Sequence, residues 1–156
     1  VRFKYKIPLT REVAIAKPSE RSVPISAAYR TYLSLAGQRI LVGRGASEND
    51  QLTKSARSND WWLHAVGVSG SHVVVPIDAS LREGLPDPLR RAAAILALHH
   101  SSIKDDLRGE VCLTRIRHLK KPKGLAPGKW QVQRSETLYI KYTKEEADQI
   151  LSRRHA

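Results

Sequence analysis

Near the middle of the chain the sequence reads Asp60-Trp61-Trp62-Leu63-His64-Ala65-Val66, a run of aromatic and β-forming residues. A second such run, Ser71–Ile77, contains three consecutive valines. The segment Gly67–Gly70 between them begins and ends with glycine, which is typical of a turn. We therefore predict two buried strands that are joined by this turn.

Further strand-like segments lie on both sides of this pair. Tyr29–Leu35 and Gln38–Val42 flank Ala36-Gly37, which predicts a hairpin. Apolar and polar residues alternate again later in the chain, and these patterns predict strands at Val111–Arg117, Trp130–Gln133 and Thr137–Tyr142.

Three other segments predict helices. The first is a short helix that is capped by Ser47 or Asn49 and ends near Asn59. The second, Leu89–Ser102, is rich in Ala and Leu and follows two prolines, and the third, Lys144–Arg154, is apolar on one side. Strands in meanders with interspersed helices predict an α+β single domain, with a mostly antiparallel or mixed β-sheet and two or three helices.

The first 25 residues differ from the rest. Residues 1–7 alternate apolar and cationic side chains, which predicts a half-buried strand or an arm that becomes one on binding. Residues 8–24 carry three prolines and no sustained period, which is typical of an extended linker. We therefore predict an extension over residues 1–25 and a folded domain over residues 26–156.

Composition indicates which partners the chain binds. Its 156 residues include 27 Lys and Arg and 15 Asp and Glu, a net charge of +12. Such a charge favours polyanionic partners, with nucleic acid first, although a solvated basic surface without a specific partner remains open. Cys112 is the single cysteine, so no intrachain disulfide can form, and no apolar run is long enough to cross a bilayer. We expect a cytoplasmic protein that does not enter a membrane.

Much of the positive charge lies in one segment without acids, residues 111–135, which we call the basic segment. Two prolines stiffen its loop, so its cations can meet phosphates at low entropic cost, and Trp130 offers a stacking face. The alternative is a loop that lysines keep soluble, with Trp130 in the core. The cations of the basic segment are Arg115, Arg117, Lys120, Lys121, Lys123, Lys129 and Arg134.

A group of polar residues around the first predicted strand forms a second candidate site. Asp60, Trp62 and His64 alternate along that strand and would share one face. Gly70-Ser71-His72 opens the next strand, and Gly43-Arg44 and Asn49-Asp50 lie upstream. These residues predict a pocket for a base or a ribose, with Trp62 as the stacking face, or a hydrogen-bonded polar core.

Catalytic and metal sites fit the sequence poorly. A hydrolytic triad would need a G-x-S-x-G elbow, which Gly70-Ser71-His72 lacks. Zinc held by His64, His72 and Cys112 lacks the usual ligand spacing. Gly124–Trp130 has three residues between its glycines where a phosphate loop has four, and no Ser or Thr for magnesium. We expect no enzymatic activity, no cofactor and no bound metal.

A series of short motifs resembles the NFACT-R domain, the RNA-binding module of the family that includes RqcH in bacteria and NEMF in animals, some of which were first described as fibronectin-binding proteins. The resemblance extends from about Tyr29 to Tyr142. Its motifs are Ile40-Leu41-Val42-Gly43-Arg44, Asn49-Asp50-Gln51-Leu52-Thr53, Asp60-Trp61-Trp62-Leu63-His64, Gly70-Ser71-His72-Val73-Val74, and Lys121-Pro122-Lys123-Gly124 with Pro127-Gly128.

The resemblance implies binding of RNA, either tRNA or rRNA, on or near the large ribosomal subunit, where full-length relatives extend stalled nascent chains. This chain departs from the family's usual residues at Gly45, Glu48 and Ser69. A protein-interaction module for a ribosomal protein or a fibronectin-type partner is the main alternative, and an enzyme acting on RNA is the third. The predicted RNA-binding residues are Arg44, Asn49, Asp50, Lys54, Asp60, Trp62, His64, Ser71, His72, Arg115, Arg117, Lys120, Lys121, Lys123 and Lys129.

Overall fold

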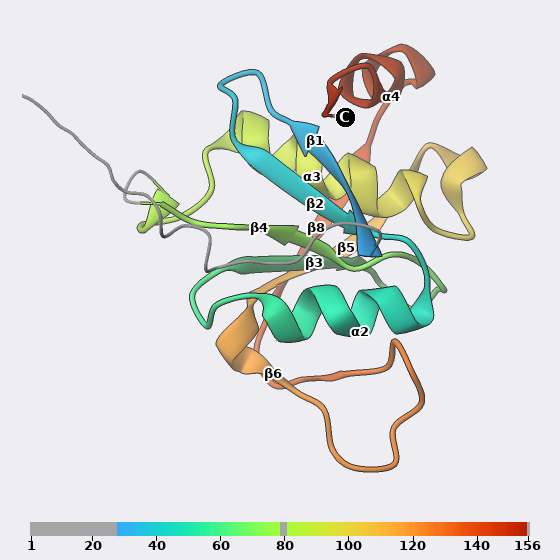
Figure 1. Ribbon diagram of the computed structural model, residues 1–156. Helices are drawn as coiled ribbons and strands as arrows, with labels where there is room; N and C mark the ends of the chain where they lie inside the picture. The colour runs from blue at the N-terminus through green and yellow to red at the C-terminus, as the bar shows by residue number, and fades with distance from the viewer. Residues whose placement is uncertain (1–27, 79–80, 156) are drawn as a thin grey trace, which may run out of the picture.

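A seven-stranded antiparallel sheet forms the centre of the computed structural model, which describes residues 28–78 and 81–155. The order across the sheet is β8-β5-β3-β4-β2-β1-β9 (Figure 1). The strands are β1 (Tyr29–Leu33), β2 (Arg39–Gly43), β3 (Trp61–Ala65), β4 (Val73–Val75), β5 (Arg108–Arg115), β8 (Glu136–Lys141) and β9 (Arg154–His155). A separate two-stranded ribbon pairs β6 (Leu119–Lys120) with β7 (Gln131–Val132).

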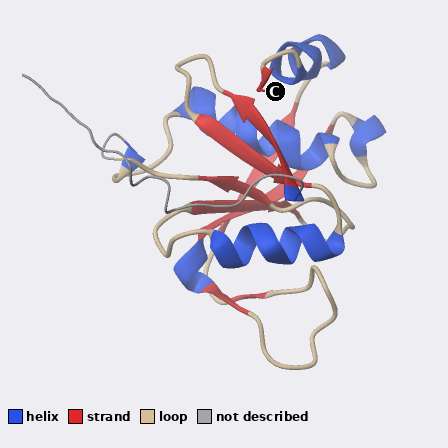
Figure 2. Cartoon of the chain, in the orientation of Figure 1, coloured by secondary structure: helices blue, strands red, loops and turns tan. Residues whose placement is uncertain are grey.

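Helices cover both faces of the sheet, so that the domain has three layers (Figures 1 and 2). Helix α2 (Ala46–Ser55) lies on one face, and α3 (Asp87–His99) lies on the other, with α4 (Lys144–Leu151) beside it. Two short 3₁₀ turns, η3 (Lys104–Asp106) and η4 (Ile116–His118), precede and follow β5. The predicted α+β class with an antiparallel sheet and helices is confirmed.

Successive side chains of β3 point to opposite faces of the sheet. Leu63 and Ala65 are fully buried in the main core, which they share with the apolar residues of α3. Trp62 points to the opposite face, where it packs with Leu41, Leu52 and neighbouring residues under α2. Because side chains alternate along a strand, His64 shares the face of Trp62, as the sequence predicted. The polar residues of the candidate site are therefore gathered between the sheet and α2.

Two predicted helix boundaries were wrong. Helix α2 begins at Ala46 with Gly45 as its N-cap, so the predicted caps Ser47 and Asn49 lie inside the helix. The side-chain amide of Asn49 is hydrogen-bonded to the backbone of Gly70 and His72, just before β4, and is not available for capping. The same helix ends at Ser55, before the predicted end near Asn59.

The end of the chain also differs from the prediction. Helix α4 stops at Leu151, and Arg154–His155 pairs with β1 as strand β9. The guanidinium of Arg153 donates to the Leu33 carbonyl at 3.0 Å, which holds the returning chain against the edge of the sheet. Such pairing depends on a partner more than a hundred residues away and leaves no local pattern. The predicted extension over residues 1–25 lies outside the described residues.

Candidate functional site

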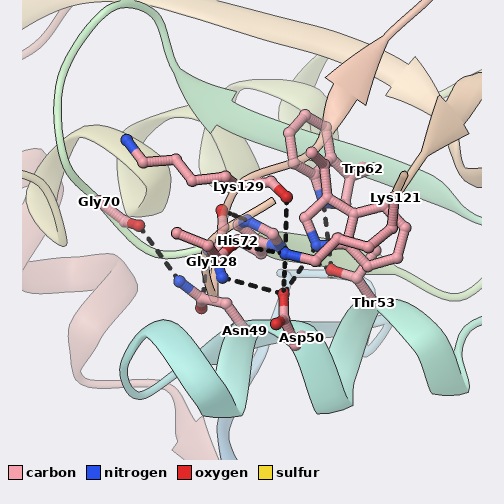
Figure 3. Close-up of polar contacts among 11 residues, drawn as sticks. Asn49, Asp50, Thr53, Trp62, Gly70, His72, Lys121, Gly128 and Lys129 are labelled. Atoms are coloured by element: carbon pink, nitrogen blue, oxygen red, sulfur yellow. Dashed lines mark hydrogen bonds and ion pairs between the residues drawn. The ribbon is translucent and has the colours of Figure 1, made fainter. Parts of the chain in front are cut away.

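A chain of hydrogen bonds runs through His72 at the centre of the polar cluster (Figure 3). Nε2 of His72 lies 3.1 Å from the Gly128 carbonyl, which can only accept, so this nitrogen carries the ring proton. Nδ1 then accepts from the Thr53 hydroxyl at 2.6 Å, and the same hydroxyl accepts from Trp62 Nε1 at 3.3 Å. One tautomer of neutral His72 satisfies every polar group in this chain.

Burial keeps His72 neutral. The side chain is 1% exposed, and burial together with the neighbouring His64 lowers its pKa to about 4. Its ring meets that of Trp62 edge to face, with ring centroids 5.0 Å apart. His72 therefore fixes the positions of its neighbours and presents no free nitrogen to a ligand.

Asn49 fastens α2 to the start of β4. Its Oδ1 accepts from the His72 backbone N–H at 3.1 Å, and its Nδ2 donates to the Gly70 carbonyl at 3.3 Å. A Cβ at Gly43 would lie 2.0 Å from Asn49 Oδ1, so this close approach requires glycine at position 43. The predicted polar residue is thus a structural tie that is 5% exposed.

Asp50 holds the loop of the basic segment against α2. We call residues 121–130 the fastened loop. One carboxylate oxygen of Asp50 accepts from Trp130 Nε1 at 2.8 Å and from the Gly128 N–H at 3.0 Å, and it lies 3.4 Å from the Lys121 ammonium. Burial alone would raise the pKa of the Asp50 carboxyl, but these hydrogen bonds and the Lys121 charge outweigh burial and lower it.

Lys121 works inside this loop. Its ammonium donates to the carbonyls of Ala126 at 2.6 Å and Lys129 at 2.7 Å, in addition to its contact with Asp50. The Lys121 side chain is 16% exposed. Its three donors are engaged within the protein, so the structure places Lys121 among the residues that shape the loop and apart from the exposed cations.

We expect Lys121→Ala to lower the melting temperature by about 5 °C, because a loss of roughly 1–2 kcal/mol shifts a domain of this size by that amount. Lys123→Ala, which removes an exposed cation from the same loop, should change the melting temperature by less than about 1 °C. Thermal denaturation followed by circular dichroism compares the two. Equal shifts would contradict the structural role of Lys121.

Two adjoining pockets open between the fastened loop and the sheet. The aromatic pocket, about 250 Å³, is lined by Trp62, His64, His72, Trp130, Val66 and Val132 among others. The serine pocket, about 430 Å³, is lined by Ser69, Ser71, Ser101, Ser102 and neighbouring backbone. His64, Gly128 and Lys129 line both pockets, so the two form one cleft with His64 between them.

An exposed cation stands at the boundary of the pockets. The side chain of Lys129 points away from the bonded groups around Asp50 (Figure 3). It forms no ion pair within residues 28–78 and 81–155. The backbone carbonyl of Lys129 accepts a hydrogen bond from the Lys121 ammonium. The loop therefore fixes the backbone position from which the free Lys129 side chain extends. The cleft therefore offers aromatic rings, hydroxyls and a positive charge at one place.

The three arginines of the basic segment lie outside the lining of the two pockets, and we call Arg115, Arg117 and Arg134 the arginine cluster. Arg115 lies 4.0 Å above the Trp61 ring and donates to the carbonyls of Asn59 and Arg82 at 3.2 and 3.0 Å. Arg117 donates to the Asn59 side chain. All three charges act on His118, so they lie close together.

The other predicted residues are scattered. Asp60 is 3% exposed, and its carboxylate accepts from the backbone N–H groups of Arg57 and Ile77, so it shapes the turn before β3 and lies away from the cleft surface. Trp62 is also 3% exposed and cannot offer its face for stacking, contrary to the prediction. Arg44, Lys54, Lys120 and Lys123 are exposed.

Sequence reasoning missed several residues of the cleft. Thr53 links Trp62 to His72, and the Gly128 backbone accepts and donates in the same cluster. Ser101 and Ser102 follow α3, which ends at His99, and lie far from the motifs in the sequence. The motif Asn49-Asp50-Gln51-Leu52-Thr53 contained Thr53, and its position four residues after Asn49 on one helix face was the available signal.

Comparisons with known proteins point to one family. Residues 28–134 match the family described as the NFACT protein RNA binding domain. The chain is 35% identical over 126 residues to the Rqc2 homolog RqcH of Bacillus subtilis, covering 80% of this chain and 21% of that protein. It is 33% identical over 118 residues to the Rqc2 homolog RqcH of Streptococcus suis, covering 73% and 20%.

A solved structure supports the same fold. The C-terminal part of the fibronectin/fibrinogen-binding protein from Streptococcus suis superposes with a TM-score of 0.73 at 29% identity, covering 86% of this chain and 52% of that one. The fold and the site define a three-layer α+β module with a cationic cleft. The chain belongs to the NFACT RNA-binding domain family. It spans about a fifth of the length of the curated relatives it matches.

No helix of the described residues is long and apolar enough to cross a membrane. Among those same residues, no three side chains of His, Cys, Asp or Glu come together as a metal site.

Proposed function

We propose that this domain binds tRNA or rRNA on or near the large ribosomal subunit in the cytoplasm, through the cleft and the exposed cations around it. The observation that carries the proposal is the fastened loop, which holds the free ammonium of Lys129 at the mouth of two pockets. Loops that are ordered before binding lose little entropy when they meet phosphates. The family match and the net charge of +12 support the same partner.

We propose further that the domain binds RNA without acting chemically on it. Both ring nitrogens of His72 are hydrogen-bonded, and the Asp50 carboxylate is engaged with the fastened loop. Neither ring nitrogen of His72 is therefore free for proton transfer, and Oδ1 of Asp50 already accepts two hydrogen bonds from the fastened loop. Extension of nascent chains by full-length relatives would then depend on parts of those proteins outside the matched fifth of their length.

A protein partner, such as a ribosomal protein or a fibronectin-type protein, is the alternative. It differs from RNA in its response to salt, because phosphate contacts release condensed counterions and protein contacts need not. Five cations of the basic segment are available, namely Arg117, Lys120, Lys123, Lys129 and Arg134, which are exposed.

If these cations meet phosphates, we expect the logarithm of RNA affinity to fall against the logarithm of salt concentration with a slope of about −3 to −4, from roughly 0.7 per phosphate on single strands. Removing two cations with Lys123→Ala and Lys129→Ala should reduce the slope by about 1.4. Fluorescence anisotropy with a labelled tRNA at several salt concentrations measures both.

The matched control is Lys144→Ala with Lys141→Ala, which removes the same charge from exposed positions at α4 and β8. This variant should keep the slope of the natural chain. A slope near zero for the natural chain, or equal slopes for the two double variants, would contradict binding through the basic segment.

A further inference from the structure

We propose that the cleft recognises one unpaired base, which lies in the aromatic pocket against the ring of His64, while its ribose and phosphate face the serine pocket and Lys129. This inference rests on the proposed RNA binding and specifies the part of the RNA that the cleft takes. Its basis is the chemistry of two adjoining pockets that share His64, Gly128 and Lys129 but are otherwise lined by different kinds of side chain.

The aromatic pocket has the size and lining for a base. Its volume of about 250 Å³ is below the range of roughly 300–1,000 Å³ that is usual for pockets enclosing whole small molecules. Rings contribute much of its wall, and the valines at positions 66 and 132, 41% and 39% exposed, lie at its surface. Aromatic walls bind the flat faces of bases and tolerate any base identity.

His64 is the ring that a base would meet. It is only partly buried, and it stacks on Trp62 with an angle of 11° and a centroid distance of 5.7 Å. His72 closes one side, with its ring nearly perpendicular to that of His64 at 5.5 Å. Burial lowers the pKa of His64, so its ring is neutral at pH 7. The result is a fixed, uncharged platform backed by a buried indole.

The serine pocket has the lining for the rest of the nucleotide. Its lining includes Ser69, Ser71 and Ser102, together with Ser101, whose hydroxyl already donates to the Leu98 carbonyl. The exposed Lys129 stands between this pocket and the aromatic one. Hydroxyls can exchange hydrogen bonds with a ribose 2′-hydroxyl, and an ammonium can meet the adjoining phosphate. A base in an RNA duplex is stacked and paired, so it cannot enter the aromatic pocket without leaving the helix.

The test is a thermodynamic cycle in which the His64 side chain is changed on the protein and the bases are removed from the RNA. We would measure affinities for a single-stranded RNA of about five nucleotides, which is within the usual site size, and for the same backbone with abasic riboses. The natural chain should bind the abasic backbone about tenfold more weakly. His64→Ala should bind both equally, whereas His64→Phe, which keeps a flat ring, should retain the difference. His155→Ala, at an exposed position on β9 that lines neither pocket, is the control and should behave like the natural chain.

Each other result has a definite meaning. Equal affinity of the natural chain for the two single strands, or equal affinity for a blunt duplex of the same length, would overturn the base pocket and leave RNA binding intact. A His64→Ala variant that weakens both single strands by the same factor would show a structural role for His64 and would also overturn the pocket. Failure to bind any of the three RNAs would overturn the proposed function itself.

Discussion

Lowering the pH from 7 to 4 should destabilise the domain by several kcal/mol, chiefly through the buried His72 and the partly buried His100. Burial lowers the pKa of His72 and of His100 to about 4 each. In the unfolded chain both imidazoles titrate near pH 6.5. Between pH 6.5 and pH 4 the unfolded chain binds protons that the folded domain does not bind. The free energy of unfolding therefore decreases as the pH is lowered through this range.

The expected size follows from the difference in pKa. Each histidine contributes at most about 3 kcal/mol, at roughly 1.4 kcal/mol per pH unit, and the loss levels off below about pH 4. His72 would lose its bond from Thr53 on protonation, since a protonated ring no longer accepts. His100 is less deeply buried and lies beside the Tyr32 hydroxyl at 3.2 Å, but its pKa is lowered as well, so both groups act in the same direction.

Denaturant unfolding at pH 7, 5.5 and 4 measures this loss. His72→Gln and His100→Gln should each be less stable at pH 7 and should each show a shallower decline toward pH 4. His155→Gln, which replaces an exposed imidazole on β9, should follow the natural chain. If the His72 and His100 variants kept the full decline, other groups would have to explain the sensitivity to acid.

The sequence predicted the α+β class and the main strands and helices because these depend on local patterns. The aromatic and valine runs of β3 and β4 and the alanine-rich α3 are strong signals, and the hairpin of β1 and β2 has a short turn. The missed strand β9 forms by pairing with the edge strand β1. The residues around Arg154 give no local signal of this pairing. Local preference therefore located the core elements, and long-range pairing decided the end of the chain.

The sequence predicted which residues belong to the candidate site, but it did not predict which of them are exposed for binding and which are bonded within the domain. Lys121 and Lys123 look alike in the sequence, yet one is bonded within the loop and the other is exposed. The difference depends on Asp50, which is separated from Lys121 by 71 positions and meets it only in the folded domain. Trp62 and Asp60 were expected at a binding surface because they are polar or aromatic, but burial assigns them to the structure.

Replacing Asp50 by Ala should cause the largest loss at the cleft. It removes the acceptor of Gly128 N–H and Trp130 Nε1 and leaves the Lys121 ammonium without its counter-charge. Since hydrogen bonds to a charged group are worth about 1.5–3 kcal/mol each, we expect a loss of roughly 3 kcal/mol in stability. Asp50→Asn keeps a neutral acceptor and should lose about 1 kcal/mol.

Whether Asp50→Ala raises or lowers the RNA affinity distinguishes an effect of net charge from an effect of loop geometry. Removing a carboxylate raises the net charge from +12 to +13, which by itself strengthens binding to a polyanion. We nevertheless expect affinity to fall at least tenfold, because the fastened loop forms a wall of both pockets and positions Lys129.

Asp148→Ala makes the same charge change on the exposed surface of α4 and should bind RNA as well as the natural chain or slightly better. Titrations at a temperature where all variants are folded make the comparison. If Asp50→Ala bound RNA as tightly as Asp148→Ala, net charge alone would account for binding, and the fastened loop would have no part in forming the site.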